Sequence, residues 1–144
     1  MTTIKLYELK KLQTEFPAKK ITSSQDAADF IRQFYGDDLE IFESVFILLL
    51  NKANNTIGYA KISQGGISGT VVDVRIICKY AVDSLATSVI LAHNHPSGNL
   101  KSSTADIAIT KKTEQALKIL DITLLDHIIL SADSYKSLAD SGEM

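Results

Sequence analysis

Val45-Phe46-Ile47-Leu48-Leu49-Leu50 is an unbroken run of six apolar residues. A strand of this composition is apolar on both faces, so other parts of the chain must cover both of them. Residues 87–92 form a second short run that is mostly apolar. The two runs predict buried strands in the middle of a sheet, with helices packed on it.

Strand and helix patterns alternate on either side of these runs. Polar residues 51–55 predict a turn between two strands. The further predicted strands are residues 4–10, 56–63, 67–72 and 122–131. Helices are predicted from Ser23 or Ser24 to Gly36, over residues 74–85 with Asp73 as the cap, and over residues 103–120. This succession predicts an α/β (mixed α+β) fold with one mixed β-sheet flanked by helices.

The composition predicts one compact domain. The chain has 144 residues, 45% of them hydrophobic, with only 7 Gly and 2 Pro. This is enough apolar material for a core and too little Gly and Pro for a disordered chain. We interpret residues 1–36 as an N-terminal strand and helix packed on the core, and residues 37–144 as the main part of the domain.

The charges of the chain are nearly balanced, with 15 Lys and Arg against 17 Asp and Glu and a formal net charge of −2. Proteins held by non-specific attraction to nucleic acid or anionic membranes are usually basic, so neither partner is indicated. The N-terminus has no apolar signal segment, and no apolar run approaches the roughly 18 residues that span a bilayer. We therefore expect a cytoplasmic protein without membrane association. The sequence predicts no particular oligomeric state.

Two of the three histidines, His93 and His95, follow the predicted strand 87–92. In an extended chain, side chains two residues apart point to the same face, so both imidazoles can converge on one metal ion. Pro96 ends the strand, and Asp106 follows near the start of the next predicted helix, where its carboxylate can complete a set of three ligands. Two histidines and one carboxylate with an open fourth position are typical of a catalytic zinc site.

Some of these residues also fit local structural roles. Ser103 and Asp106 match a capping box, which is compatible with a metal site because a capped helix start holds Asp106 in place. His127, beside Asp126 in a predicted strand, is expected to be a core histidine or a support for the ligands rather than a ligand. Cys78 is the only cysteine, which excludes an intrachain disulfide and a zinc site built from several thiolates.

The segment from His93 to Asp106 resembles a known motif. Its spacing, His93-x-His95-Pro96-x6-Ser103-x2-Asp106, matches the JAMM zinc motif of the JAB/MPN superfamily. Three strings are similar to the RadC-like branch of that superfamily: Ile90-Leu91-Ala92-His93-Asn94-His95-Pro96-Ser97-Gly98, Gly65-Gly66-Ile67-Ser68 and Leu124-Leu125-Asp126-His127. The resemblance covers residues 42–138, about two thirds of the chain.

The resemblance implies the JAB/MPN (cytidine-deaminase-like) architecture for residues 37–144 and a bound Zn²⁺. His93, His95 and Asp106 would be the zinc ligands, with a water in the fourth position. The Ser103 hydroxyl would bind the substrate oxygen as it becomes an oxyanion.

A glutamate just before the first core strand completes the family's site. Glu43 stands at this place, with Glu40 as the alternative, and would act as the general base. The implied activity is that of a zinc-dependent metallopeptidase or isopeptidase, which uses a zinc-activated water to cleave an amide bond in a peptide or isopeptide substrate.

Two other functions remain open, a RadC-like accessory protein of DNA repair and an inactive metal-binding interaction module. Full-length RadC-like proteins usually carry an N-terminal helical region associated with DNA binding. Only 42 residues precede Glu43, too few for such a region and a linker, so nucleic acid is not the expected partner. Inactive relatives usually lack ligands, whereas all five candidate site residues are present here, which favours the hydrolase.

Overall fold

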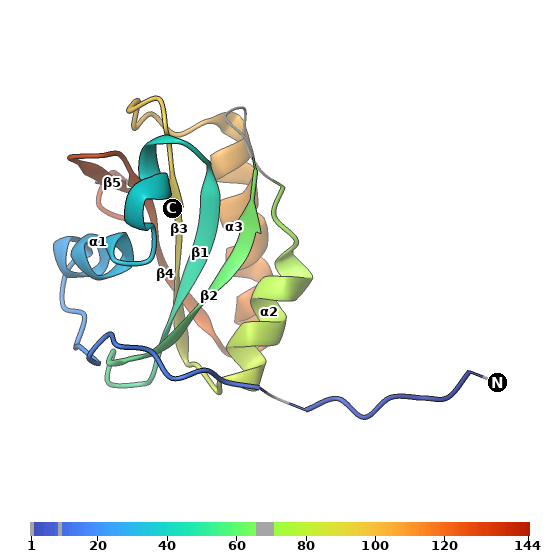
Figure 1. Ribbon diagram of the computed structural model, residues 1–144. Coiled ribbons are helices and arrows are strands. Elements are labelled where there is room, and N and C mark those ends of the chain that lie inside the picture. Colours follow the sequence, from blue (N-terminus) through green and yellow to red (C-terminus); the bar gives the residue numbers. More distant parts are fainter. Residues whose placement is uncertain (1, 9, 66–70) are drawn as a thin grey trace.

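The computed structural model describes residues 2–8, 10–65 and 71–144. A five-stranded sheet in the order β2-β1-β3-β4-β5 forms its centre (Figure 1). The strands are β1 (Ser44–Leu50), β2 (Thr56–Gln64), β3 (Ser88–Asn94), β4 (Thr123–Leu130) and β5 (Tyr135–Ser137). β3 and β4 are parallel, and the other neighbouring pairs are antiparallel. This mixed sheet confirms the predicted α/β fold in a single domain.

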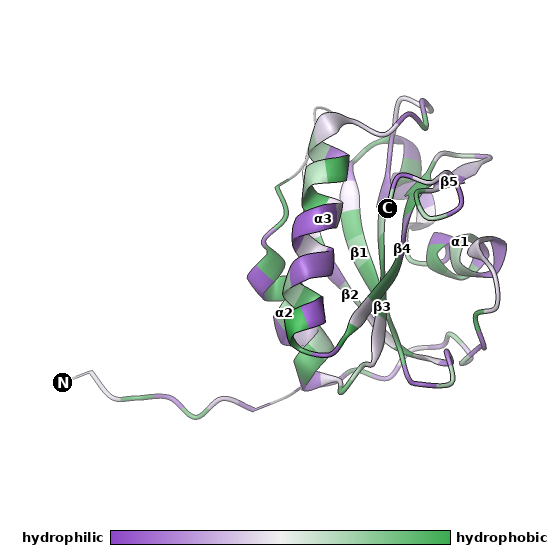
Figure 2. Ribbon diagram, turned by 180° about the vertical axis from the view of Figure 1, so that it is seen from behind, coloured by the Kyte–Doolittle hydropathy of each residue, from purple (hydrophilic) through white to green (hydrophobic). Residues whose placement is uncertain are grey.

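β1 lies between β2 and β3, and all seven of its residues are buried. Its even-numbered apolar residues pack with α1 (Ser24–Arg32) on one face of the sheet. Its odd-numbered residues pack with α2 (Val74–Asp83) and α3 (Thr104–Ile119) on the other face, which is seen from the helix side in Figure 2. β1 is therefore the doubly covered strand that the apolar run predicts.

The three α-helices begin at predicted polar caps. Ser23, Asp73 and Ser103 each accept a hydrogen bond from a backbone N–H of the first helical turn. α2 ends two residues before its predicted end, because Leu85 has a φ of 57°, which lies outside the helical region. A short 3-10 helix, η1 (Gly36–Glu40), follows α1 and is not predicted by the sequence pattern.

The prediction of an N-terminal strand at residues 4–10 is wrong. Residues 2–8 and 10 belong to no helix or strand, and the Ile4 side chain is 99% exposed. Figure 1 shows this segment running away from the body of the domain. Apolar alternation yields a stable strand only where neighbouring strands supply hydrogen bonds and a buried face. In the described part of the chain, the first residue that forms a β-bridge is Lys20, well after residues 4–10. α1, the other element predicted for the segment, packs on the core.

Two further differences concern short segments. The predicted strand at residues 67–72 lies mostly outside the described residues, and Val71 and Val72 are in no strand. β5 is missing from the prediction because its three residues are too few for a periodic pattern. Within the described part of the chain, no helix combines the length and the apolar character needed to span a membrane.

Candidate metal centre

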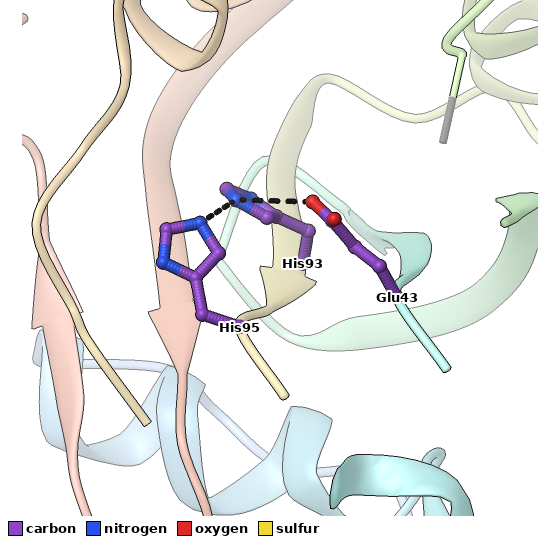
Figure 3. Close-up of side chains that lie close together, drawn as sticks. All are labelled: Glu43, His93 and His95. Carbon is purple, nitrogen blue, oxygen red and sulfur yellow. Dashed lines mark hydrogen bonds and ion pairs between the residues drawn. The ribbon is translucent and has the colours of Figure 1, made fainter. Parts of the chain in front are cut away.

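One edge of the sheet brings together residues that are far apart in the sequence. β1 and β3 are antiparallel with Val45 opposite His93, so the start of β1 lies beside the end of β3. Glu43 directly precedes β1, and His95 directly follows β3. Asp106 comes from the first turn of α3. Figure 3 shows the side chains of Glu43, His93 and His95 pointing toward one another at this edge.

The distances between these side chains define a compact cluster. Ligand atoms of Glu43, His93 and His95 all lie within 4.8 Å of one another. The Nε2 atom of His93 is 2.8 Å from Nε2 of His95 and 3.9 Å from Oε1 of Glu43. Asp106 Oδ1 is 3.2 Å from His93 Nε2, and Asp106 Oδ2 is 3.4 Å from His95 Nε2. The structure therefore brings together four of the five predicted site residues through their polar atoms.

Hydrogen bonding at the rim of the cluster shows which atoms point inward. Nδ1 of His95 is 2.6 Å from the backbone carbonyl oxygen of Asn99. A carbonyl only accepts, so Nδ1 carries the proton, and Nε2 of the neutral ring has a lone pair directed into the cluster. The neighbouring Asp106 and Glu43 side chains offer carboxylate oxygens. A group of acceptors at these distances attracts a positive charge, either a proton or a metal ion.

The pKa shifts of Asp106 and His95 also arise from the contacts within the cluster. Burial raises the pKa of the Asp106 carboxyl, but its contacts with the His93 and His95 rings outweigh it and hold that pKa well below its ordinary value. The hydrogen bond with Asp106 raises the pKa of His95, against the opposing effect of burial. Both shifts show that the cluster stabilises negative charge on Asp106 together with positive charge beside it.

The donor set fits zinc. Imidazole nitrogen and carboxylate oxygen are ligands that Zn²⁺ accepts, and two histidines with one carboxylate form a catalytic type of site. Of the two carboxylates, Asp106 lies closer to both ring nitrogens than Glu43 does to His93. Cys78 packs instead against the apolar core on the α2 and α3 side.

The structure separates the two candidates for the general base. Glu43 is half-buried, with 18% of its side chain exposed, and belongs to the cluster. Glu40 is exposed at the end of η1 and is outside the cluster.

Ser103 lies beside the cluster as the cap of α3. Its hydroxyl oxygen accepts a hydrogen bond from the Asp106 backbone N–H (3.0 Å), and its own N–H donates to Asp106 Oδ2 (2.8 Å). The predicted capping box is thus present. Because the hydroxyl oxygen acts as an acceptor in the cap, its proton is free to be donated to another group.

Asn94 is a site-building residue that the sequence analysis missed. It is fully buried; its Oδ1 accepts from the backbone N–H of Ser44 (2.8 Å), and its Nδ2 donates to the carbonyl oxygens of Leu39 (2.6 Å) and Phe42 (2.7 Å). One side chain thereby holds the backbone on both sides of Glu43 against β3. The only sign of this role in the sequence was the position of Asn94 between the candidate ligands His93 and His95. That position does not show which backbone groups its side chain contacts.

His127 is also in contact with the cluster, through His93. It is 1% exposed, and its Nε2 atom lies 2.7 Å from Nδ1 of His93. Burial lowers the pKa of His127 well below its ordinary value. The structure therefore places it as a buried neighbour of a cluster residue, one of the two arrangements expected from the sequence.

The fold and the cluster define a class of protein: a single α/β domain with a potential metal centre where β1, β3 and α3 meet. Comparison with protein families identifies the family. The chain belongs to the RadC-like JAB domain family, whose pattern matches residues 21–143.

Curated proteins that this chain resembles include UPF0758 proteins from three bacteria. The relative from Flavobacterium johnsoniae is 46% identical over 124 residues, that from Porphyromonas gingivalis 41% over 130, and that from Neisseria meningitidis 36% over 134. These matches cover 86%, 89% and 92% of this chain but only 53%, 56% and 59% of the relatives. The chain thus spans somewhat more than half the length of these relatives.

Proposed function

We propose that this domain is a zinc-dependent metallohydrolase of the JAMM type that cleaves an amide bond in a peptide or isopeptide substrate. His93, His95 and Asp106 bind the zinc ion, and Glu43 and Ser103 act on the substrate. The observation that supports the proposal is the cluster itself, in which the acceptor atoms of two imidazoles and two carboxylates converge at a sheet edge.

Zinc, when bound, polarises the amide carbonyl and lowers the pKa of a water molecule toward about 7. Glu43 takes the proton from the attacking water and delivers it to the leaving nitrogen. Its position suits this role because its oxygen is 3.9 Å from His93 Nε2 and the side chain is partly open to solvent.

Ser103 contributes a hydrogen bond to the substrate. Its hydroxyl proton is free, because the α3 cap uses only the oxygen as an acceptor. Donated to the carbonyl oxygen, this proton stabilises the negative charge that develops there during attack. Asp106 holds Ser103 in place through the two hydrogen bonds of the capping box.

Metal content tests the zinc site first. Protein purified without added zinc is expected to contain about one zinc ion per chain. The double variant His93→Ala/His95→Ala should lose it, with circular dichroism confirming that the variant is folded. Unchanged zinc content in the folded double variant would refute the site.

A matched pair of glutamate variants tests the hydrolase. Glu43→Gln should keep zinc but lower hydrolysis of a panel of fluorogenic peptide amides by about 10²- to 10⁴-fold, because the proton acceptor is lost. Glu40→Gln, an exposed neighbour, should remain within about twofold of the unmodified protein. Bound zinc without any hydrolysis that depends on Glu43 would favour the inactive metal-binding module, and salt-dependent DNA binding would favour the DNA-repair alternative.

A further inference from the structure

A chain of buried hydrogen bonds connects His93 to α3 behind the metal cluster. His127 in β4 is the partner of Leu91 in the β3–β4 ladder, so its ring lies beside that of His93. Nε2 of His127 is 2.7 Å from Nδ1 of His93, and its Nδ1 is 2.6 Å from the hydroxyl oxygen of Thr110. That hydroxyl oxygen is in turn 2.6 Å from the backbone carbonyl oxygen of Asp106. His127 and Thr110 are each only 1% exposed.

The positions of the protons in this chain follow from its last member. The Asp106 carbonyl can only accept, so the single hydroxyl proton of Thr110 is donated to it. The Thr110 oxygen must then accept from Nδ1–H of His127. Thr110 and His93 occupy both nitrogens of His127, and burial of this ring disfavours a charge on it, so it is neutral and its Nε2 is an acceptor.

The proton position on His93 follows from that of His127. Since His127 Nε2 accepts, Nδ1 of His93 carries the proton, and Nε2 of His93 has its lone pair. This lone pair points to the same place as that of His95, whose Nδ1 donates to Asn99. The opposite proton order would put a hydrogen on His93 Nε2 and block it as a ligand.

We propose that Thr110 and His127 are positioning residues that fix the tautomer and the ring orientation of His93, and that Asp106 supplies both the carboxylate at the cluster and the carbonyl that sets the proton order. This inference rests on the proposed zinc site, because fixing the tautomer of His93 has a purpose only if His93 binds a metal. The tautomer itself is a property of the metal-free protein and can be measured separately.

The tautomer of His93 is the first measurement. The chain has three histidines, so long-range ¹H–¹⁵N correlation spectra of the metal-free protein contain only three imidazoles to assign. His93 is expected to carry its proton on Nδ1. In Thr110→Val the buried Nδ1–H of His127 loses its acceptor, so His127 should shift its proton to Nε2 and His93 should become protonated on Nε2. An unmodified protein with His93 protonated on Nε2 would overturn the inference.

Zinc affinity, measured by competition with a chromophoric chelator, is the second readout. Thr110→Val should weaken zinc binding by about 10- to 100-fold, because the change in His127 removes the acceptor that supports the metal-binding His93. Thr110→Ser keeps the hydroxyl and should restore it. Thr113→Val is the matched control, because Thr113 is equally buried one turn later on α3 and its hydroxyl has no partner within the described residues.

Two variants of His127 complete the test. His127→Gln provides an amide oxygen that can accept from His93 Nδ1, whereas His127→Leu provides no acceptor. The glutamine variant should bind zinc more tightly than the leucine variant. Equal affinity in these two variants, or unchanged affinity in Thr110→Val, would refute the positioning role. If the unmodified protein binds no zinc while His93 shows the expected tautomer, the proposed function fails and the tautomer assignment stands.

Discussion

His93 and Asn94 are neighbours in β3, and Asp126 and His127 are neighbours in β4, yet each pair divides between the two faces of the sheet. Side chains alternate along a strand, so both histidines face α3, while Asn94 and Asp126 face the side of α1. On the α3 face the polar atoms contact one another and end at the metal cluster. On the α1 face they are saturated by backbone groups and a serine of the same chain.

The difference shows that the two faces of the sheet have different roles: one carries the candidate metal ligands, and the other stabilises the surrounding backbone. Asn94 and Asp126 tie irregular segments to the sheet, the loop before β1 in one case and the residues around β5 in the other. His93 and His95 each keep the lone pair on Nε2 available, because their Nδ1 atoms already make hydrogen bonds to His127 and Asn99. Substitutions on the α1 face should therefore change stability, and substitutions on the α3 face should change metal affinity.

Asn94→Ala is expected to have the largest effect on stability. Three backbone groups lose their hydrogen bonds to this buried side chain, which should lower the free energy of unfolding by about 3 kcal/mol. Urea unfolding of the zinc-free protein measures this, with exposed Asn99→Ala as the control. Zinc affinity of the folded variant should change less than in Thr110→Val. A variant as stable as the unmodified protein would contradict the role of Asn94 in holding the backbone around Glu43 against β3.

Asp126→Ala should have the next largest effect. The Asp126 carboxylate accepts from Ser137 Oγ (2.5 Å), Ala139 N (3.1 Å) and His127 N (2.7 Å). Burial raises the pKa of Asp126, so removing the charge offsets part of the loss, and we expect a decrease of about 2 kcal/mol in the same unfolding experiment. If this variant weakened zinc binding as much as His127→Leu does, the separation between the faces would be refuted.

The pH dependence of the metal-free protein tests the α3 face with a smaller effect. The pKa of Asp106 is depressed in the folded state, so its contribution is present above the ordinary value of 3.8 and is lost as the pH falls below it. The pKa of His95 is raised, so its contribution is present below 6.5 and is lost as the pH rises through the folded value. Burial lowers the pKa of His127, so its neutral ring costs stability as the pH falls below 6.5. Stability should therefore be greatest close to the ordinary histidine value of 6.5.

Thermal unfolding at a series of pH values measures this dependence. Asp106→Asn should flatten the profile at both ends, because the asparagine has no charge to pair with His95. Added zinc should stabilise the unmodified protein more at neutral than at acidic pH, because protons compete less for the histidines there. A profile of Asp106→Asn identical to that of the unmodified protein would show that the pair contributes nothing.

Thr113→Val should have the smallest effect. The Thr113 hydroxyl is buried without a partner within the described residues, so an apolar group of the same shape removes an unsatisfied polar atom. We expect the free energy of unfolding to rise by up to about 1 kcal/mol in urea unfolding. A clear loss of stability would show that this hydroxyl has a bonding partner after all.

Local patterns in the sequence predicted most elements of the fold. The apolar run of β1, the helix caps and the spacing of His93, His95, Ser103 and Asp106 all depend on contacts within a few residues, so they can be recognised from the sequence. The same reasoning failed for residues 4–10, because an apolar alternation does not show whether a partner strand exists. It named Glu43 as the base but kept Glu40 as the alternative, because the sequence does not show which of them lies beside β3.

The sequence by itself therefore determined the fold class and the residue types available for a metal centre. The tertiary structure alone decided which of them meet. Asn94 reaches the backbone of Ser44 across 50 residues of sequence, and His127 reaches His93 across 34. These contacts depend on strand order and register, which are set by the packing of the whole sheet rather than by any local run of residues.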